Sequence, residues 1–120
     1  MKRPARRSRN PKDVAGRSKC PLHLIPATAD IQTARALAHG AAKYGEWNWR
    51  EIPINASPYI AAARRHLAAW FDGQDNDPDS GLSHLAHVAA TMAILMDAEA
   101  VGTLVDDRPK SGTVAGLMKG

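Results

Sequence analysis

The sequence is poor in the residues on which several classes of protein depend. Its 120 residues include a single cysteine, Cys20, which excludes an internal disulfide framework and favours a reducing cytoplasm as the location. No apolar run approaches the roughly 18 residues that a transmembrane helix needs. The Arg-rich start is not followed by an apolar stretch, so no secretory signal is expected. We therefore expect a cytoplasmic protein with no membrane partner.

Large apolar side chains are also scarce. Leu, Ile, Val and Phe together number 21, against 22 alanines. Alanine favours helix, but it buries little area per residue. The composition therefore predicts closely packed helices and partner subunits. Together with three predicted helices and no strand pattern, it indicates an all-α fold, an antiparallel helical bundle whose thin core is completed by oligomerisation.

Positive charge is confined to one end of the chain. Residues 1–19 carry eight Lys or Arg and one acid, whereas the remainder is mildly acidic. We expect residues 1–19 to be a disordered basic tail with at most weak nucleic-acid contact, because no aromatic side chain is present there to stack on bases. Residues 20–109 would form the helical domain, and residues 110–120 a flexible or weakly helical C-terminal tail.

Three helices are predicted from apolar periodicity and end signals. The first covers about residues 30–43 and places His39 and Lys43 on its polar outer face. The second starts with Ser57 as its N-cap, stops before Gly73, and turns His66 inward. The third starts near residue 79 or 80 and stops before Gly102.

The third predicted helix has no charged residue from position 81 to 96. A helix that is apolar nearly all round is a buried one. Two other helices cannot cover it in so small a chain. We therefore expect a homodimer or a tetramer, with this helix near the interface.

A cluster of histidines and carboxylates is the strongest chemical signal. His66 faces inward on the second helix, His84 and His87 lie one turn apart on the third, and the acidic connecting loop includes Asp77 and Asp79. Folding the hairpin would bring them to one end of the helix pair. Carboxylates suit Mg²⁺ or Mn²⁺, and three imidazoles would suit Zn²⁺. The histidines could instead bind phosphate or act as a general base.

A second candidate site lies between the first two helices, in the segment KYGEWNWR. Lys43 and Arg50 could hold phosphates. Trp49 could stack on a base, and Asn48 could read its edge. The same segment is equally well explained as a helix end followed by a loop that its tryptophans anchor.

Four segments occur in a familiar order: LIPATADIQTARALAHGAAKYGEWNWR, RHL, DPDSGLSHLAH and DDRP. Together they resemble the phage-type dATP/dGTP diphosphohydrolase N-terminal domain family, over about residues 22–109. That family is similar to the MazG-like all-α nucleoside-triphosphate pyrophosphohydrolases. Those enzymes hold a divalent metal with Glu pairs, where this chain offers Arg65-His66 and the stretch from His84 to His87.

The resemblance implies a divalent-metal-dependent diphosphohydrolase that converts a purine deoxynucleoside triphosphate, dGTP or dATP, to the monophosphate and pyrophosphate, in phage nucleotide-pool remodelling. The expected roles are as follows: His66 and His87 catalytic; Asp77, Asp79 and His84 metal ligands; Lys43, Arg50 and Arg65 phosphate-binding; Asn48 and Trp49 base-binding. Two alternatives stay open. One is a zinc-dependent hydrolase with a His66/His84/His87 site, and the other is a non-catalytic domain that binds nucleotide or nucleic acid.

Overall fold

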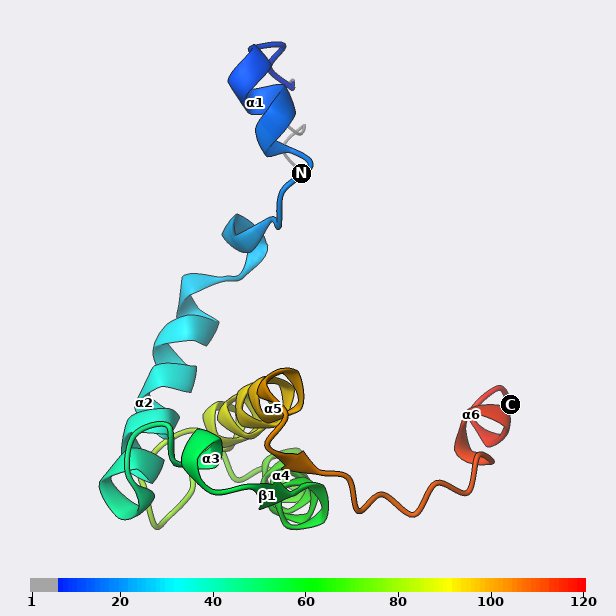
Figure 1. The fold of residues 1–120 in the computed structure, drawn as a ribbon. Coiled ribbons are helices and arrows are strands. Elements are labelled where there is room, and N and C mark those ends of the chain that lie inside the picture. Colours follow the sequence, from blue (N-terminus) through cyan, green and yellow to red (C-terminus); the bar gives the residue numbers. More distant parts are fainter. Residues whose placement is uncertain (1–6) are drawn as a thin grey trace.

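A computed structural model describes residues 7–120 and has an all-α fold, as predicted (Figure 1). Its elements are α1 (Pro11–Gly16), a 3-10 turn (Leu22–Leu24), α2 (Ala27–Tyr44), α3 (Asn48–Glu51), β1 (Ile54–Asn55), α4 (Ala56–Phe71), α5 (His84–Val101), β2 (Leu104–Val105) and α6 (Val114–Leu117). Within these residues, no helix is both long and apolar enough to cross a bilayer.

The centre of the fold is α5, which packs against both α4 and α2 (Figure 1). A two-residue parallel pairing of β1 with β2 ties the hairpin together, with Ile54 opposite Leu104. Because β1 leads into α4 and β2 follows α5, the start of α4 lies beside the end of α5. The two helices therefore run antiparallel.

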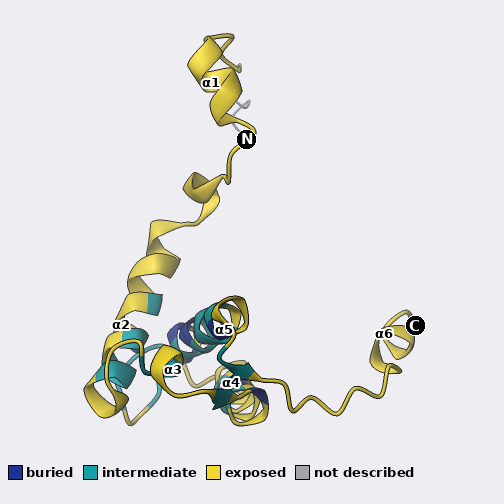
Figure 2. Cartoon of the chain, viewed as in Figure 1, coloured by how far each residue is buried: buried dark blue, intermediate teal, exposed yellow. Residues whose placement is uncertain are grey.

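The core of the described residues is made almost entirely of alanine. None of their large side chains is fully buried. Figure 2 shows that the buried positions concentrate on and around α5. The buried apolar residues are Ala36, Ala56, Ala63, Ala86, Ala90 and Ala98. Small side chains let the helices approach closely, but they remove little apolar area from water.

Both ends of the described chain extend away from the three long helices (Figure 1). The N-terminal arm carries α1, a short helix in a segment for which we expected no structure. The basic residues Lys2, Arg3 and Arg6 lie outside the described part. The C-terminal arm ends in α6, where Leu117 and Met118 are largely exposed.

The helix boundaries differ from prediction where side chains find other partners. Ser57 is not the N-cap of α4, since Asn55 occupies that position. The Ser57 amide and hydroxyl instead donate to the carboxylate of Asp107, at 2.8 and 2.5 Å. The third helix begins at His84, later than predicted, with Ser83 as its N-cap.

Candidate functional site

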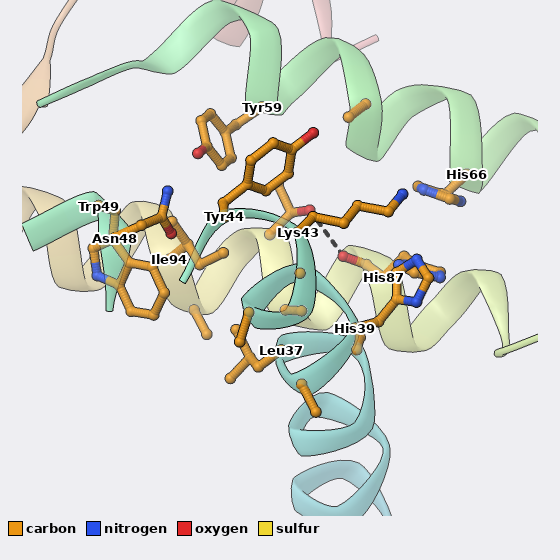
Figure 3. Close-up of a pocket in the computed structure, with 18 of the residues that line it drawn as sticks. Leu37, His39, Lys43, Tyr44, Asn48, Trp49, Tyr59, His66, His87 and Ile94 are labelled. Carbon is orange, nitrogen blue, oxygen red and sulfur yellow. Dashed lines mark hydrogen bonds between the residues drawn. The ribbon is translucent and has the colours of Figure 1, made fainter. Parts of the chain in front are cut away.

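A cavity of about 1060 Å³ opens between α2, α4 and α5 and the segment around α3 (Figure 3). It has two chemically different ends. In Figure 3, His39, His66 and His87 lie at one end, and Asn48 and Trp49 lie at the other. Lys43 and two tyrosines lie between them. One cavity therefore joins the two candidate sites that are well separated in the sequence.

The polar end is a cluster of imidazole rings. The Nδ1 atoms of His66 and His84 are 2.8 Å apart. The His66 ring also stacks on His87, with centroids 4.6 Å apart and planes 9° from parallel. On its far side, His87 Nε2 is hydrogen-bonded to Ser80 Oγ at 2.6 Å.

The tautomer of His84 follows from its partner. This side chain is buried, and its Nε2 lies 2.7 Å from the carbonyl oxygen Oε1 of Gln74. A carbonyl oxygen only accepts, so Nε2 carries a proton and donates it to Gln74. The other ring nitrogen, Nδ1, faces its hydrogen-bond partner His66 Nδ1. An outer partner that orients an imidazole in this way is typical of metal-binding histidines.

The turn before α5 holds the carboxylate of this cluster. Asp77 Oδ2 accepts a hydrogen bond from the Ser80 amide at 3.0 Å, and the Asp77 amide donates to the Leu82 carbonyl. Gly81 adopts a φ of 73°, a left-handed conformation that glycine adopts without strain. The turn therefore points Asp77 at the histidines.

Three side chains form a group that could hold a metal ion: His66, Asp77 and His84, whose ligand atoms all lie within 4.8 Å of one another. Two imidazole nitrogens and one carboxylate oxygen form a mixed set that fits Mn²⁺ or a later divalent metal better than Mg²⁺, which favours oxygen. Asp79 lines the cavity but is not part of this group.

Burial and local charges favour the metal-binding protonation states. Desolvation lowers the pKa of both His66 and His87 below the ordinary value of 6.5. Burial alone would raise the pKa of Asp77, but hydrogen bonds from Ser80 and the neighbouring histidines outweigh it and lower the pKa. At neutral pH the rings are thus neutral and the carboxylate is ionised.

The other end of the cavity is aromatic. Trp49 donates its indole N–H to Asp97 Oδ2 at 2.7 Å. Tyr44 and Tyr59 line the cavity between this end and the histidines, in the middle of the view in Figure 3. Flat apolar faces next to an amide, that of Asn48, are the kind of surface on which a nucleobase stacks.

All of the predicted site residues except Arg50 line the cavity. Arg50 instead pairs with Asp97, with Nε 2.8 Å from Oδ2. Hydrogen bonds from Arg50 and Trp49 lower the pKa of Asp97 to about 2. Lys43 and Arg65, the other two predicted phosphate ligands, both line the cavity.

Sequence reasoning missed four residues of the site: His39, Gln74, Ser80 and Asp97. His39 meets the edge of His87 at 5.9 Å between centroids, although its helix position placed it on the outer face. The predicted apolar stripe of α2 is correct in part: Leu37 packs against the core and lines the cavity, whereas Ile31 is exposed. Asp97 could have been noticed as the first charge after the uncharged stretch of α5.

Comparisons with known proteins identify the family of this chain and a relative. The family described as dATP/dGTP diphosphohydrolase, N-terminal, matches residues 9–108. A dATP/dGTP diphosphohydrolase of Salmonella phage PMBT28 is 33% identical over 99 residues, which cover 82% of this chain. The match spans only 33% of that relative's length. No solved structure is significantly similar.

Proposed function

The chain belongs to the dATP/dGTP diphosphohydrolase N-terminal family, and we propose that it hydrolyses a purine deoxynucleoside triphosphate to the monophosphate and pyrophosphate. One observation supports this most directly. A single cavity places an aromatic end next to Asn48 and a polar end with a carboxylate, histidines and the cations Lys43 and Arg65. These are the surfaces that a nucleobase and a triphosphate require.

At the polar end, His66, Asp77 and His84 would hold a divalent ion. Such an ion screens phosphate charge and lowers the pKa of a bound water. In Figure 3 the Lys43 side chain extends toward His66, where it would neutralise a phosphate oxygen. Arg65 would serve the same purpose from α4.

His87 is the residue we propose as general base. Its pKa is lowered, so it is neutral and able to accept a proton at pH 7. Water would attack the α-phosphorus, its proton would pass to His87, and the bond between the α-phosphorus and the bridging oxygen would break. Pyrophosphate then leaves, and the deoxynucleoside monophosphate remains.

The zinc alternative needs His66, His84 and His87 to converge on one ion. The His66 and His87 rings are stacked nearly parallel, and parallel stacked rings do not direct in-plane lone pairs at a common point. This geometry supports the mixed set with Asp77 instead. Metal analysis of the purified protein tests this: stoichiometric, tightly held zinc would favour the alternative.

The direct test is incubation with each of the four deoxynucleoside triphosphates and Mg²⁺ or Mn²⁺, with chromatography of the products. We expect monophosphate and pyrophosphate from dATP or dGTP, faster with Mn²⁺. His87→Ala should lower kcat by roughly 10²- to 10⁴-fold. Nucleotide binding without turnover by the wild-type chain would favour the non-catalytic alternative.

We also propose that the working form is a homodimer or a larger assembly of this chain. Its accessible surface is 9889 Å², whereas a compact chain of this mass exposes roughly 6,300 Å². The radius of gyration is 18.4 Å, against roughly 14 Å for a compact chain of this length. The outer face of α4 exposes Ile60, Leu67 and Phe71. A second copy would cover this apolar face of α4.

The proposed reaction has a natural setting in a phage-infected cytoplasm, where it would remove dATP or dGTP from the host pool. Weak nucleic-acid contact by the basic tail stays a separate prediction. In the described part of that tail the basic side chains are exposed.

A further inference from the structure

The helix α5 contributes one acidic residue, Asp97, to the lining of the cavity. Asp97 receives three hydrogen bonds from the segment around α3. Trp49 Nε1 lies 2.7 Å from Oδ2, and Arg50 contributes Nε at 2.8 Å to Oδ2 and a terminal nitrogen at 2.9 Å to Oδ1. The Asp97 carboxylate therefore holds two adjacent residues, Trp49 and Arg50, that lie nearly 50 positions earlier in the sequence.

The segment around α3 depends on such tertiary contacts for its stability. The helix has only four residues, Asn48–Glu51, and so short a helix is not stable alone. Trp47, at its start, adopts a φ of 58°, which non-glycine residues seldom do unless their surroundings hold them. The Arg50 guanidinium lies over the Trp47 ring, 4.4 Å from its centroid.

Asn48 behaves differently from its neighbours. Across residues 7–120, the side chain of Asn48 has no hydrogen-bond partner, although it lines the cavity. Among the same residues, the side-chain hydrogen bonds of residues 47–51 all run to Asp97. The segment is thus held through Trp49 and Arg50, while the amide between Trp47 and Trp49 stays available to a ligand.

We propose that Asp97 is a positioning residue for purine recognition: through Trp49 and Arg50 it holds the indole face and the Asn48 amide in place to receive the base. This rests on the proposed function, which puts a purine nucleotide in this cavity. Arg50 then serves the base end, in place of the phosphate role expected from its sequence position. Because Asp97 lies away from the histidine cluster, its loss should weaken binding more than it slows chemistry.

Steady-state kinetics of the full chain with dGTP and dATP, in the presence of Mn²⁺, tests the proposal. Asp97→Ala should raise KM at least 10-fold and change kcat by less than 3-fold. Asp97→Asn should lie between it and the wild type, since an amide keeps one acceptor but loses the charge. Glu99→Gln, two residues further along α5, is the matched control and should behave as wild type. A fall in kcat with unchanged KM would overturn the proposal.

A second readout needs no turnover. Near-UV circular dichroism of the nucleotide-free protein should show a weaker tryptophan signal in Asp97→Ala and an unchanged one in Glu99→Gln. Quenching of tryptophan fluorescence by dGTP measures binding separately from hydrolysis. A wild type that binds dGTP but does not hydrolyse it would contradict the proposed function and leave the role of Asp97 measurable. Unaltered dGTP binding by Asp97→Ala would contradict the role itself.

If Asp97→Ala does not fold, Arg50→Ala tests the same contact, because Arg50 is the more exposed residue of the Arg50–Asp97 pair. This variant should also raise KM, and the effects of Arg50→Ala and Asp97→Asn should be less than additive in the double variant, because both weaken the contact between Arg50 and Asp97. Additive effects on KM would contradict a shared mechanism.

Discussion

At the scale of single residues, the orientation of the Gln74 amide bears on the proposed metal site. Gln74 accepts from His84 Nε2, so His84 Nδ1 is the acceptor of the 2.8 Å hydrogen bond with His66 Nδ1. Gln74→Leu should keep the volume but remove the acceptor. We expect 10- to 100-fold weaker binding of Mn²⁺, on the order of what such outer partners contribute. Titration of Mn²⁺ followed by electron paramagnetic resonance measures it.

Gln32→Leu on the exposed face of α2 is the control for that prediction and should bind Mn²⁺ as the wild type does. Equal affinities in Gln74→Leu and wild type would show that the His84 tautomer is set in another way.

The lowered pKa values of His66 and His87 predict a pH dependence of stability. The pKa values of these two histidines in the folded state lie below the unfolded value of 6.5. At a pH between the folded and unfolded pKa values, the unfolded chain therefore binds more protons than the folded chain. The stabilisation is fully present above pH 6.5 and is lost as the pH falls below it. The melting temperature of the metal-free protein should therefore drop between pH 7.5 and pH 5.5.

The variant with both His66→Gln and His87→Gln should show a flatter pH profile over that window. The same steep drop in this variant would assign the pH dependence to other groups.

At the scale of elements, α4 depends on a residue far away in the sequence. The Asp107 carboxylate accepts from the amide and hydroxyl of Ser57 in the first turn of the helix, and these bonds lower its pKa. A negative charge at this end also interacts favourably with the helix dipole. The DDRP segment therefore has a structural role: it ties the chain after α5 to the start of α4.

Asp107→Ala should lower the melting temperature by roughly 4 °C or more, on the scale expected for a small domain that loses a helix cap. Asp106→Ala is a closely matched comparison, because Asp106 pairs only with Arg108 and Lys110 in its own segment among the described residues. It should melt close to wild type. Thermal unfolding followed at 222 nm measures both. Equal losses in the two variants would contradict the capping role.

At the scale of the whole molecule, the exposed apolar face of α4 predicts self-association. Phe71 is 88% exposed in the single chain, so a charge there would cost a monomer little. Phe71→Glu should dissociate the assembly to monomers, since an unpaired charge in a buried interface is strongly unfavourable. Phe71→Leu should remain associated. Analytical ultracentrifugation at micromolar concentration distinguishes the outcomes, and a monomeric wild type would contradict the proposed assembly.

The sequence by itself determined the all-α class and the positions of the three long helices. Alanine content and apolar periodicity are local properties, and they act on each helix independently of the rest of the fold. The convergence of His66, His84 and Asp77 was also predictable. A hairpin with a short connection must bring the end of one helix beside the start of the next, and these residues flank that connection.

Only the tertiary structure decided which face of α2 meets the site and which partners Arg50 and Ser57 find. The stripe on α2 is made mostly of small residues, so its apolar pattern is weak, and packing against α5 places His39 and Lys43 in the cavity together with Leu37 of that stripe. Arg50 and Ser57 bond to Asp97 and Asp107, about 50 residues away. Pairings at that distance depend on how the helices are arranged in space, and local sequence patterns carry no information about that arrangement.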